Sequence, residues 1–162
     1  MLPLRVLVVD DHRLFRQGLI GLMGTRPDLV EIIGEASSGC EALHLGNELK
    51  PDVVLMDIHM PDGDGLEATA CLREHFPNVN VVMLTASEAD DHLFQAMRLG
   101  AAGYLLKDLD ADELFDLLGG LERGEVVMTR AMSSRLLRQA SSADSNPSTE
   151  ALTEREIDVL RL

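Results

Sequence analysis

Acidic and cationic side chains stand directly after several short apolar segments of this chain. Asp10 and Asp11 follow the first segment, Asp57 follows another, Thr85 ends a further one, and Lys107 comes two residues after the last. If these segments are parallel strands of one sheet, their carboxyl ends meet at one edge, where such sheets bind ligands. We therefore expect three carboxylates, one hydroxyl and one ammonium group to converge on a single site.

These residue types favour phosphoryl chemistry assisted by a metal ion. Three crowded carboxylates repel one another and hold protons unless a cation lies among them. Oxygen ligands without His or Cys at the matching strand ends suit Mg²⁺, which takes few protein ligands and keeps water or phosphate oxygens. A lysine and a threonine hydroxyl beside the ion can bind phosphoryl oxygens, and one carboxylate can be the nucleophile. Taken singly, each residue has an ordinary structural explanation, but their joint occurrence at four strand ends favours a common site.

The rest of the N-terminal block supplies the elements that position such a site. Apolar segments alternate with stretches of helical periodicity, which is typical of βαβ units and a parallel sheet covered on both faces. Five strands are expected, at Leu4–Asp10, Leu29–Ala36, Asp52–Met56, Val79–Thr85 and Ala101–Leu105. A helix should follow each strand, at Asp11–Met23, Gly39–Leu49, Asp64–His75, Asp90–Leu99 and Asp110–Arg123. Asp64 and Asp110 are the expected N-caps of their helices.

Charge divides the chain into an acidic and a neutral part. The 162 residues contain 28 acidic and 14 basic side chains, a net charge of −14. Residues 1–125 hold 23 of the acids and 9 of the bases, and residues 126–162 hold five of each. Such acidity argues against a nucleic-acid groove formed by this chain alone.

The neutral part predicts a helix, a linker and a second helix start. A helix is expected at Arg130–Ala140, and the Ser-rich residues 141–149 have the composition of a linker. Thr153 and Glu156 then form a capping box, yet the chain ends at Leu162, less than three turns later. Because so short a helix is marginal alone, we expect a second domain to begin here and to be cut off.

Neither a membrane segment nor a zinc site is predicted. No apolar run approaches the roughly 20 residues that span a bilayer, and the N-terminus lacks the apolar segment of a signal peptide, so a cytoplasmic location is expected. Cys40 and Cys71 lack the paired spacing of zinc ligands, and we expect both to be small core residues on helices.

Several segments resemble the receiver domains of two-component response regulators. They are VLVVDDH at 6–12, VVLMDIHMPDGDGLEA at 53–68, VVMLTAS at 81–87 and AGYLLKD at 102–108. The resemblance implies an α/β fold, a (βα)5 flavodoxin-like or CheY-like doubly wound parallel sheet with strand order 2-1-3-4-5, and a receiver domain over residues 1–124. Residues 125–150 would be a helical extension and flexible linker. Residues 151–162 look like the start of a LuxR-type helix-turn-helix domain, as in the NarL/FixJ family.

The resemblance also assigns the phosphoryl chemistry. Asp57 would take a phosphoryl group from a phosphohistidine of a sensor histidine kinase, or from a small donor such as acetyl phosphate. Asp11 and Asp57 would bind Mg²⁺ directly, the backbone carbonyl of His59 would be a third ligand, and Asp10 would act mainly through bound water. Lys107 would pair with the phosphoryl oxygens.

Further roles concern switching and the lifetime of the acyl phosphate. Thr85 would bond a phosphoryl oxygen and Tyr104 would swing inward behind it, so that these two form the switch. The side chains of His59 and Ser87 would tune the hydrolysis rate. The side chains of His12 and His59 are not expected to bind metal or carry phosphate.

The implied function is a signalling switch rather than a turnover enzyme. Phosphorylation would favour homodimers through the helix from Asp90, the last strand and the helix from Asp110, although related regulators also pair through their first and last helices. Promoter DNA would be bound only through the missing C-terminal domain. A stand-alone receiver that titrates a kinase or inhibits a partner stays open as an alternative output.

Two other classes fit the residues less well. A haloacid-dehalogenase-type phosphohydrolase carries its nucleophile on the first strand in an Asp-x-Asp pattern, whereas Asp10 and Asp11 are adjacent here and the best nucleophile candidate follows the third strand. A flavodoxin-like cofactor binder needs a phosphate loop rich in Ser, Thr or Gly after the first strand, where this chain carries two acids.

Overall fold

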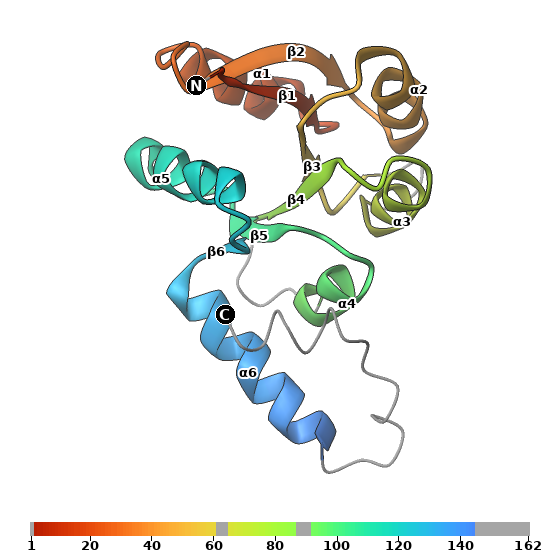
Figure 1. The fold of residues 1–162 in the computed structure, drawn as a ribbon, viewed down its shortest axis with the longest axis vertical. Helices are drawn as coiled ribbons and strands as arrows, with labels where there is room; N and C mark the ends of the chain where they lie inside the picture. The colour runs from red at the N-terminus through yellow and green to blue at the C-terminus, as the bar shows by residue number, and fades with distance from the viewer. Residues whose placement is uncertain (1, 61–64, 87–91, 145–162) are drawn as a thin grey trace.

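Short runs of aliphatic residues form the centre of a parallel sheet in the computed structural model, which describes residues 2–60, 65–86 and 92–144 (Figure 1). Its strands are β1 Leu4–Val9, β2 Val30–Ala36, β3 Val53–Asp57, β4 Asn80–Thr85, β5 Gly103–Leu106 and β6 Val127–Met128. The order is β2-β1-β3-β4-β5-β6, and every neighbouring pair is parallel. The predicted order 2-1-3-4-5 is confirmed, and the two-residue β6 adds an edge strand that the sequence did not predict.

Helices cover both faces of this sheet, as parallel sheets require. On one face lie α1 Arg13–Met23 and α5 Ala111–Glu122, and on the other lie α2 Gly39–Leu49, α3 Gly65–His75 and α4 Leu93–Arg98 (Figure 1). Alternate residues of β1 serve the two faces: Val6 and Val8 join the apolar cluster under α1 and α5, whereas Leu7 and Val9 join the opposite cluster. The site is therefore built on a sheet that is buried on both sides.

Local hydrogen bonds explain where the helices begin. The Ser38 side chain accepts a hydrogen bond from the Glu41 N–H, and Asp110 accepts one from the Glu113 N–H, so the predicted Asp110 cap is confirmed. Asp64 lies outside the described residues. The first helix begins at Arg13 rather than Asp11, because the Asp10 carboxylate holds the His12 N–H at 2.7 Å and His12 keeps an extended backbone as N-cap. Both acids after β1 thus stay in the loop.

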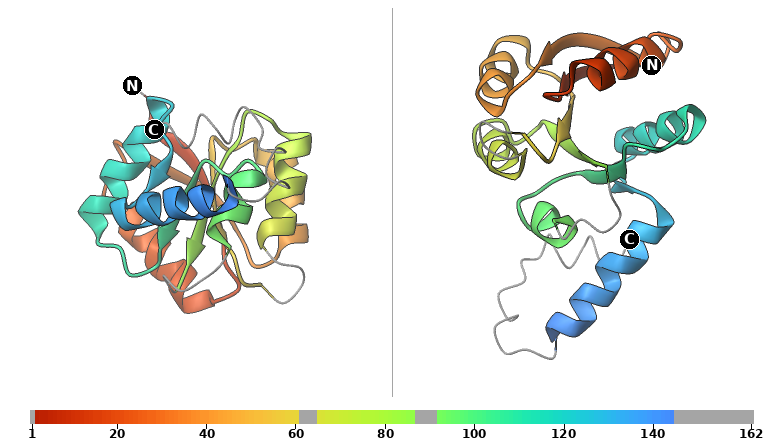
Figure 2. Two further views of the ribbon diagram at one scale, coloured as in Figure 1. Left: turned by 90° about the horizontal axis from the view of Figure 1, so that it is seen from below. Right: turned by 180° about the vertical axis from the view of Figure 1, so that it is seen from behind.

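The C-terminal extension packs against the helices that cover the sheet. Helix α6 spans Arg130–Asp144, four residues beyond the expected end at Ala140, and nothing in residues 141–144 is a helix-breaking Gly or Pro. Met132 and Leu136 are buried in the same cluster as Leu93 and Met97 of α4. Figure 2 shows α6 lying beside α4. One part of the expected output face, the α4 side, is therefore covered by α6 in this structure.

Two smaller expectations can be checked against the same structure. Cys40 and Cys71 both lie on helices, but Cys40 is exposed and Cys71 only partly buried, so the prediction of core positions is wrong for Cys40. Within the three described ranges, no helix combines the length and the apolar character that a membrane crossing needs.

Candidate functional site

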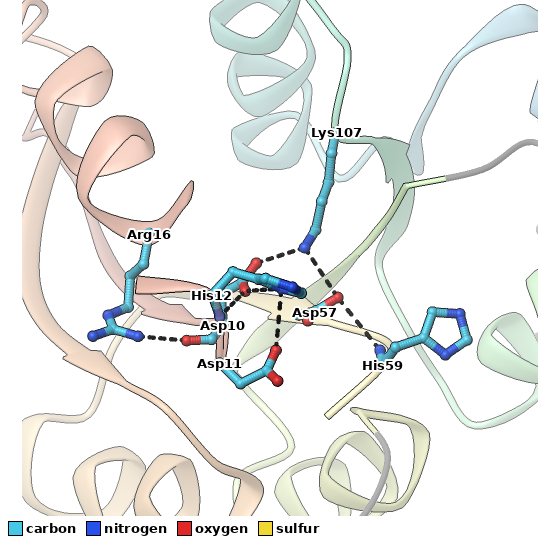
Figure 3. Close-up of polar contacts among 7 residues, drawn as sticks. All are labelled: Asp10, Asp11, His12, Arg16, Asp57, His59 and Lys107. Carbon is cyan, nitrogen blue, oxygen red and sulfur yellow. Dashed lines mark hydrogen bonds and ion pairs between the residues drawn. The ribbon is translucent and has the colours of Figure 1, made fainter. Parts of the chain in front are cut away.

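The carboxyl ends of β1, β3 and β5 bring two buried acids and one lysine into contact (Figure 3). Asp10 follows β1 and is completely buried, and Asp57 is the last residue of β3 and is 2% exposed. The Lys107 ammonium donates to Asp10 Oδ2 at 2.7 Å and lies 3.3 Å from Asp57 Oδ1. One cation thus bridges two carboxylates that come from the neighbouring strands β1 and β3.

Asp10 is fixed by its surroundings through several hydrogen bonds. Its N–H donates to the Ala36 carbonyl of the neighbouring strand at 3.0 Å, and its Oδ1 accepts the His12 N–H. Its own carbonyl accepts a hydrogen bond of 2.6 Å from Arg16, which also pairs with Glu35 at 2.9 Å. These contacts make Asp10 a rigid part of the site rather than a mobile surface acid.

Asp57 and Asp11 each keep one buried oxygen that accepts no hydrogen bond from the described part of the chain, Asp57 Oδ2 and Asp11 Oδ1. Buried carboxylate oxygens normally have donors, so a pair of them without donors is typical of ligands for a cation. One atom each from Asp10, Asp11, His12 and Asp57 lie within 4.8 Å of one another. The donor set therefore fits a divalent ion such as Mg²⁺.

The electrostatics of Asp57 support the same interpretation. The pKa of Asp57 is raised from 3.8 to about 6, because burial and, second, repulsion from Asp10 outweigh the opposing effects of the Lys107 ammonium and the His59 N–H. A second positive charge in the pocket would lower this pKa again and keep Asp57 ionised over a wider pH range.

Thr85 and Tyr104 are buried to the same extent as Asp10 and Asp57. Thr85 ends β4 with 1% of its surface exposed, and its carbonyl accepts a hydrogen bond from the Lys107 N–H at 2.8 Å. Tyr104, in β5, is completely buried in the cluster that contains Met132 and Leu136 of α6. The structure thus has Tyr104 inward, with the C-terminal helix in the same core.

His59 approaches Asp57 only through its backbone. Its N–H donates to Asp57 Oδ1 at 3.3 Å, while its ring points away from the acids and meets His92 edge to face, with ring centroids 5.4 Å apart (Figure 3). Ser87, the other expected tuning residue, lies outside the described residues.

The sequence analysis did not identify two residues that position the site, Gly65 and Arg16. Gly65, the first residue of α3, donates its N–H to the Ile58 carbonyl at 2.9 Å, and a Cβ there would stand 3.0 Å from the Asp57 carbonyl carbon and closer still to the carbonyl oxygen. The sequence signal that could have found Gly65 is its place at the end of an Asp-Gly-Asp-Gly segment, within the motif quoted above at 53–68. Arg16, which holds the Asp10 carbonyl, carries no such signal.

A doubly wound parallel sheet with this acidic pocket and lysine defines the receiver class. The family model of the response regulator receiver domain matches residues 6–119. The chain therefore belongs to the response regulator family, and it is a signalling protein rather than a turnover enzyme.

Individual relatives narrow the resemblance to regulators of the LuxR type. The chain is 37% identical to the transcriptional regulatory protein LiaR of Bacillus subtilis over 160 residues, which cover 98% of this chain and 75% of LiaR. It is 36% identical to the response regulator protein VraR of Staphylococcus aureus over 165 residues, with 99% and 76% covered.

Solved structures agree with this placement. A LuxR-family response regulator from Aurantimonas sp. SI85-9A1 superposes with a TM-score of 0.79 at 28% identity, covering 86% of this chain and 99% of that one. The receiver domain of the response regulator NarL from Mycobacterium tuberculosis gives a TM-score of 0.71 at 35% identity, with 76% and 98% covered. The predicted resemblance to LuxR-type response regulators is thus confirmed.

Proposed function

We propose that Asp57 accepts a phosphoryl group from the phosphohistidine of a sensor histidine kinase and that this controls the output of the protein. The observation that carries the proposal is the buried Asp57 Oδ2, which accepts no hydrogen bond from the described residues and lies in a pocket shared with Lys107 and two further acids. An Asp57 oxygen attacks phosphorus, the phosphorus–nitrogen bond breaks, and the imidazole leaves as an acyl phosphate forms.

The neighbours of Asp57 would prepare and then stabilise that product. Asp11, Asp57 and the His59 carbonyl would hold Mg²⁺, and Asp10 would act through bound water. Bound Mg²⁺ supplies neutralising charge for the phosphoryl oxygens. Lys107, which now bridges Asp10 and Asp57, would exchange its Asp57 contact for a phosphoryl oxygen. The side chains of His59 and Ser87 would tune hydrolysis of the acyl phosphate.

The switch would start from two donors that are linked by their backbones. Phosphorylation adds a charge of about −1.5 to −2, and the loop arrangement that offers it more donors gains population. The Thr85 hydroxyl and the Lys107 ammonium are those donors, and the hydrogen bond from the Lys107 N–H to the Thr85 carbonyl couples their movements. Tyr104 follows Thr85 and keeps its inward position in the phosphorylated form.

Phosphorylation would favour a homodimer. The position of α6 changes the surface that we assign to this dimer. Because α6 covers the α4 side of the expected face, the surface of α1 and α5 is the better candidate. Leu14 on α1 is 85% exposed and directly precedes Phe15, which lines a cavity of about 200 Å³ together with Leu114 of α5 and Lys107. Since Lys107 both lines this cavity and contacts Asp57, its movement would reach the dimer surface.

The output would be transcription regulation, as the name of LiaR indicates for that relative. We divide the protein into a receiver at 1–124, a helical extension and linker at 125–150, and the start of a LuxR-type helix-turn-helix domain at 151–162. Only that C-terminal domain would bind promoter DNA, and the cytoplasmic location expected from the sequence belongs to this proposal.

The test is intact-protein mass spectrometry after incubation with acetyl phosphate, with and without Mg²⁺, combined with size-exclusion chromatography. We expect a gain of one phosphate that requires both Mg²⁺ and Asp57, together with a shift to dimer. Asp57→Asn should abolish the gain, whereas Glu31→Gln, which removes an exposed acid on β2, should leave it unchanged. Failure with acetyl phosphate, beryllofluoride and phosphorylated kinase alike would contradict the proposal.

A further inference from the structure

One imidazole lies at the acidic pocket itself. His12 Nδ1 is 3.4 Å from Asp11 Oδ1 and 3.5 Å from Asp10 Oδ1, and it belongs to the group of four potential ligands that includes Asp57. Figure 3 shows the His12 ring directed at the carboxylates of Asp10 and Asp11, whereas the ring of His59 points away from them. The sequence analysis did not expect this side chain to bind metal.

The position of His12 is set by the loop and not by burial of its ring. His12 is the N-cap of α1 with φ −84° and ψ 100°, and its N–H is held by Asp10 Oδ1. Its side chain is 71% exposed, so the ring closes the solvent side of the pocket. On the inner side stands Asp57, whose side chain is 3% exposed and whose Oδ2 accepts no hydrogen bond from the described residues.

The spacing of these atoms matches the coordination of one ion. Metal–ligand bonds of about 2.0–2.2 Å place neighbouring ligand atoms about 3.0–3.6 Å apart. Both separations of His12 Nδ1 from carboxylate oxygens lie in this range. A pocket that offers carboxylates on its inner side and an imidazole at its entrance therefore has the composition of a mixed nitrogen and oxygen site.

Imidazole distinguishes between metals. Mg²⁺ is a hard ion that is satisfied by carboxylates, carbonyls and water, whereas imidazole binds Co²⁺, Ni²⁺ and Zn²⁺ well. We propose that His12 is a further metal ligand, through which this pocket also binds a divalent transition ion of the Co²⁺, Ni²⁺ or Zn²⁺ type. The inference rests on the proposed function, because the same acids hold the ion in both.

The consequence is a choice between two metal forms of one receiver. With Mg²⁺ the imidazole stays free and the remaining coordination positions hold water or phosphoryl oxygens. With a transition ion, His12 occupies one of those positions and ties the start of α1 to the pocket. The metal selectivity of the site then depends on a residue outside the set that phosphorylation requires.

Calorimetric titration of the metal-free protein with Mg²⁺, Co²⁺ and Ni²⁺ at neutral pH tests the proposal. His12→Gln, which keeps a polar side chain but removes the imidazole, should weaken Co²⁺ and Ni²⁺ binding about tenfold or more and Mg²⁺ binding by less than about twofold. The matched control is His44→Gln, because His44 is 72% exposed and lies 3.8 Å from a Glu48 oxygen but far from the pocket in sequence. It should change none of the three affinities.

Proton NMR of the Co²⁺-loaded protein gives a second measurement that does not depend on affinity. One strongly shifted exchangeable imidazole proton is expected in the wild type and in His44→Gln, and it should be lost in His12→Gln. Co²⁺ binding that is unchanged in His12→Gln, or that shows no such proton, would overturn the inference. If Mg²⁺ binds and Asp57 is phosphorylated in that case, the proposed function stands; if Mg²⁺ does not bind the wild type, its metal part fails as well.

Discussion

Asp57 carries an energetic conflict in the metal-free protein. It is almost completely buried, it lies near the buried Asp10, and the two carboxylates share the single positive charge of Lys107. A buried charge that is not fully compensated lowers the stability of the folded protein. Here that loss occurs at Asp57, the residue proposed to accept the phosphoryl group.

This conflict predicts a pH-dependent stability. In the unfolded chain Asp57 loses its proton near its ordinary pKa of 3.8, but in the folded protein it does so at about 6. The folded state thus binds more protons between these values, so the contribution of Asp57 to stability falls as pH rises through this window and stays low at neutral pH. Without Mg²⁺, Asp57→Asn should therefore exceed the wild type in unfolding free energy by about 1–3 kcal/mol at pH 7.

Urea denaturation in the presence of a chelator measures this difference. The gap between Asp57→Asn and the wild type should close as the pH approaches 4, and added Mg²⁺ should stabilise the wild type more than the variant. An equal gap at pH 4 and pH 7 would show that the conflict at Asp57 is absent.

The packing of Gly65 leads to a second prediction about a single residue, because a Cβ there would meet the backbone of Asp57 and Ile58. Gly65→Ala should cost about 1–3 kcal/mol of stability and slow phosphorylation of Asp57 by acetyl phosphate, because the Asp57 backbone must shift. Gly21→Ala is the matched control: its Cβ would meet nothing within 4 Å, and it lies inside helix α1, where Ala is favoured over Gly. Equal phosphorylation rates in both variants would contradict the positioning role of Gly65.

At the scale of elements, the contact between α6 and α4 is the feature that the sequence did not predict. A helix was expected at Arg130–Ala140, but the partner against which it packs was not. Met132 and Leu136 pack with α4, so the element that leads away from the receiver is also part of its core. Any shift of α4 that accompanies switching must therefore either carry α6 along or release it.

Leu136→Glu should undock α6, because a charge replaces a side chain that is only 4% exposed. We expect a loss of about 2–4 kcal/mol of stability and faster amide exchange in both α6 and α4 by mass spectrometry. Leu137→Glu changes the next residue, which is 49% exposed, and should have little effect on either measurement. Similar exchange in the two variants would mean that α6 is not held by this contact.

The same elements show how much of the structure the sequence could predict. The strand order was predicted by the resemblance to receiver domains. The meeting of Asp10, Asp57 and Lys107 was predictable from the residues, because the carboxyl ends of parallel strands lie at one edge of a sheet. The edge strand β6 was not predictable, since two residues have no periodicity and their pairing depends on the close approach of Val127 to Gly103. Gly65 and Arg16 were missed for a different reason: each contacts backbone only six to eight residues earlier in the chain, but across a loop whose path the sequence pattern does not reveal.

At the scale of the whole molecule, the two sides of the sheet have different surfaces available. One side is extended by α6, while the other leaves Leu14 exposed directly before Phe15, which lines the cavity together with Leu114 of α5. An exposed leucine on a helix that lines an apolar cavity is a natural anchor for a second copy of the chain.

Leu14→Asp should therefore weaken the phosphorylated dimer at least about tenfold in Kd without preventing phosphorylation of Asp57. Analytical ultracentrifugation with and without acetyl phosphate measures the dimer, and intact mass measures the phosphate. The control is Leu137→Asp, a change at an exposed leucine of α6. If Leu137→Asp weakens the dimer and Leu14→Asp does not, the dimer uses the side of α4 and α6 instead.

The bond between Lys107 and Asp10 joins residues 97 positions apart in the chain. Contacts of such separation form late, after the strands between them have assembled. A growing polypeptide on the ribosome consequently has no competent pocket until β5 has emerged and joined the sheet, even though the phosphoacceptor was synthesised about fifty residues earlier. If Asp57 accepts the phosphoryl group as proposed, nascent and truncated chains that lack β5 would not be phosphorylated.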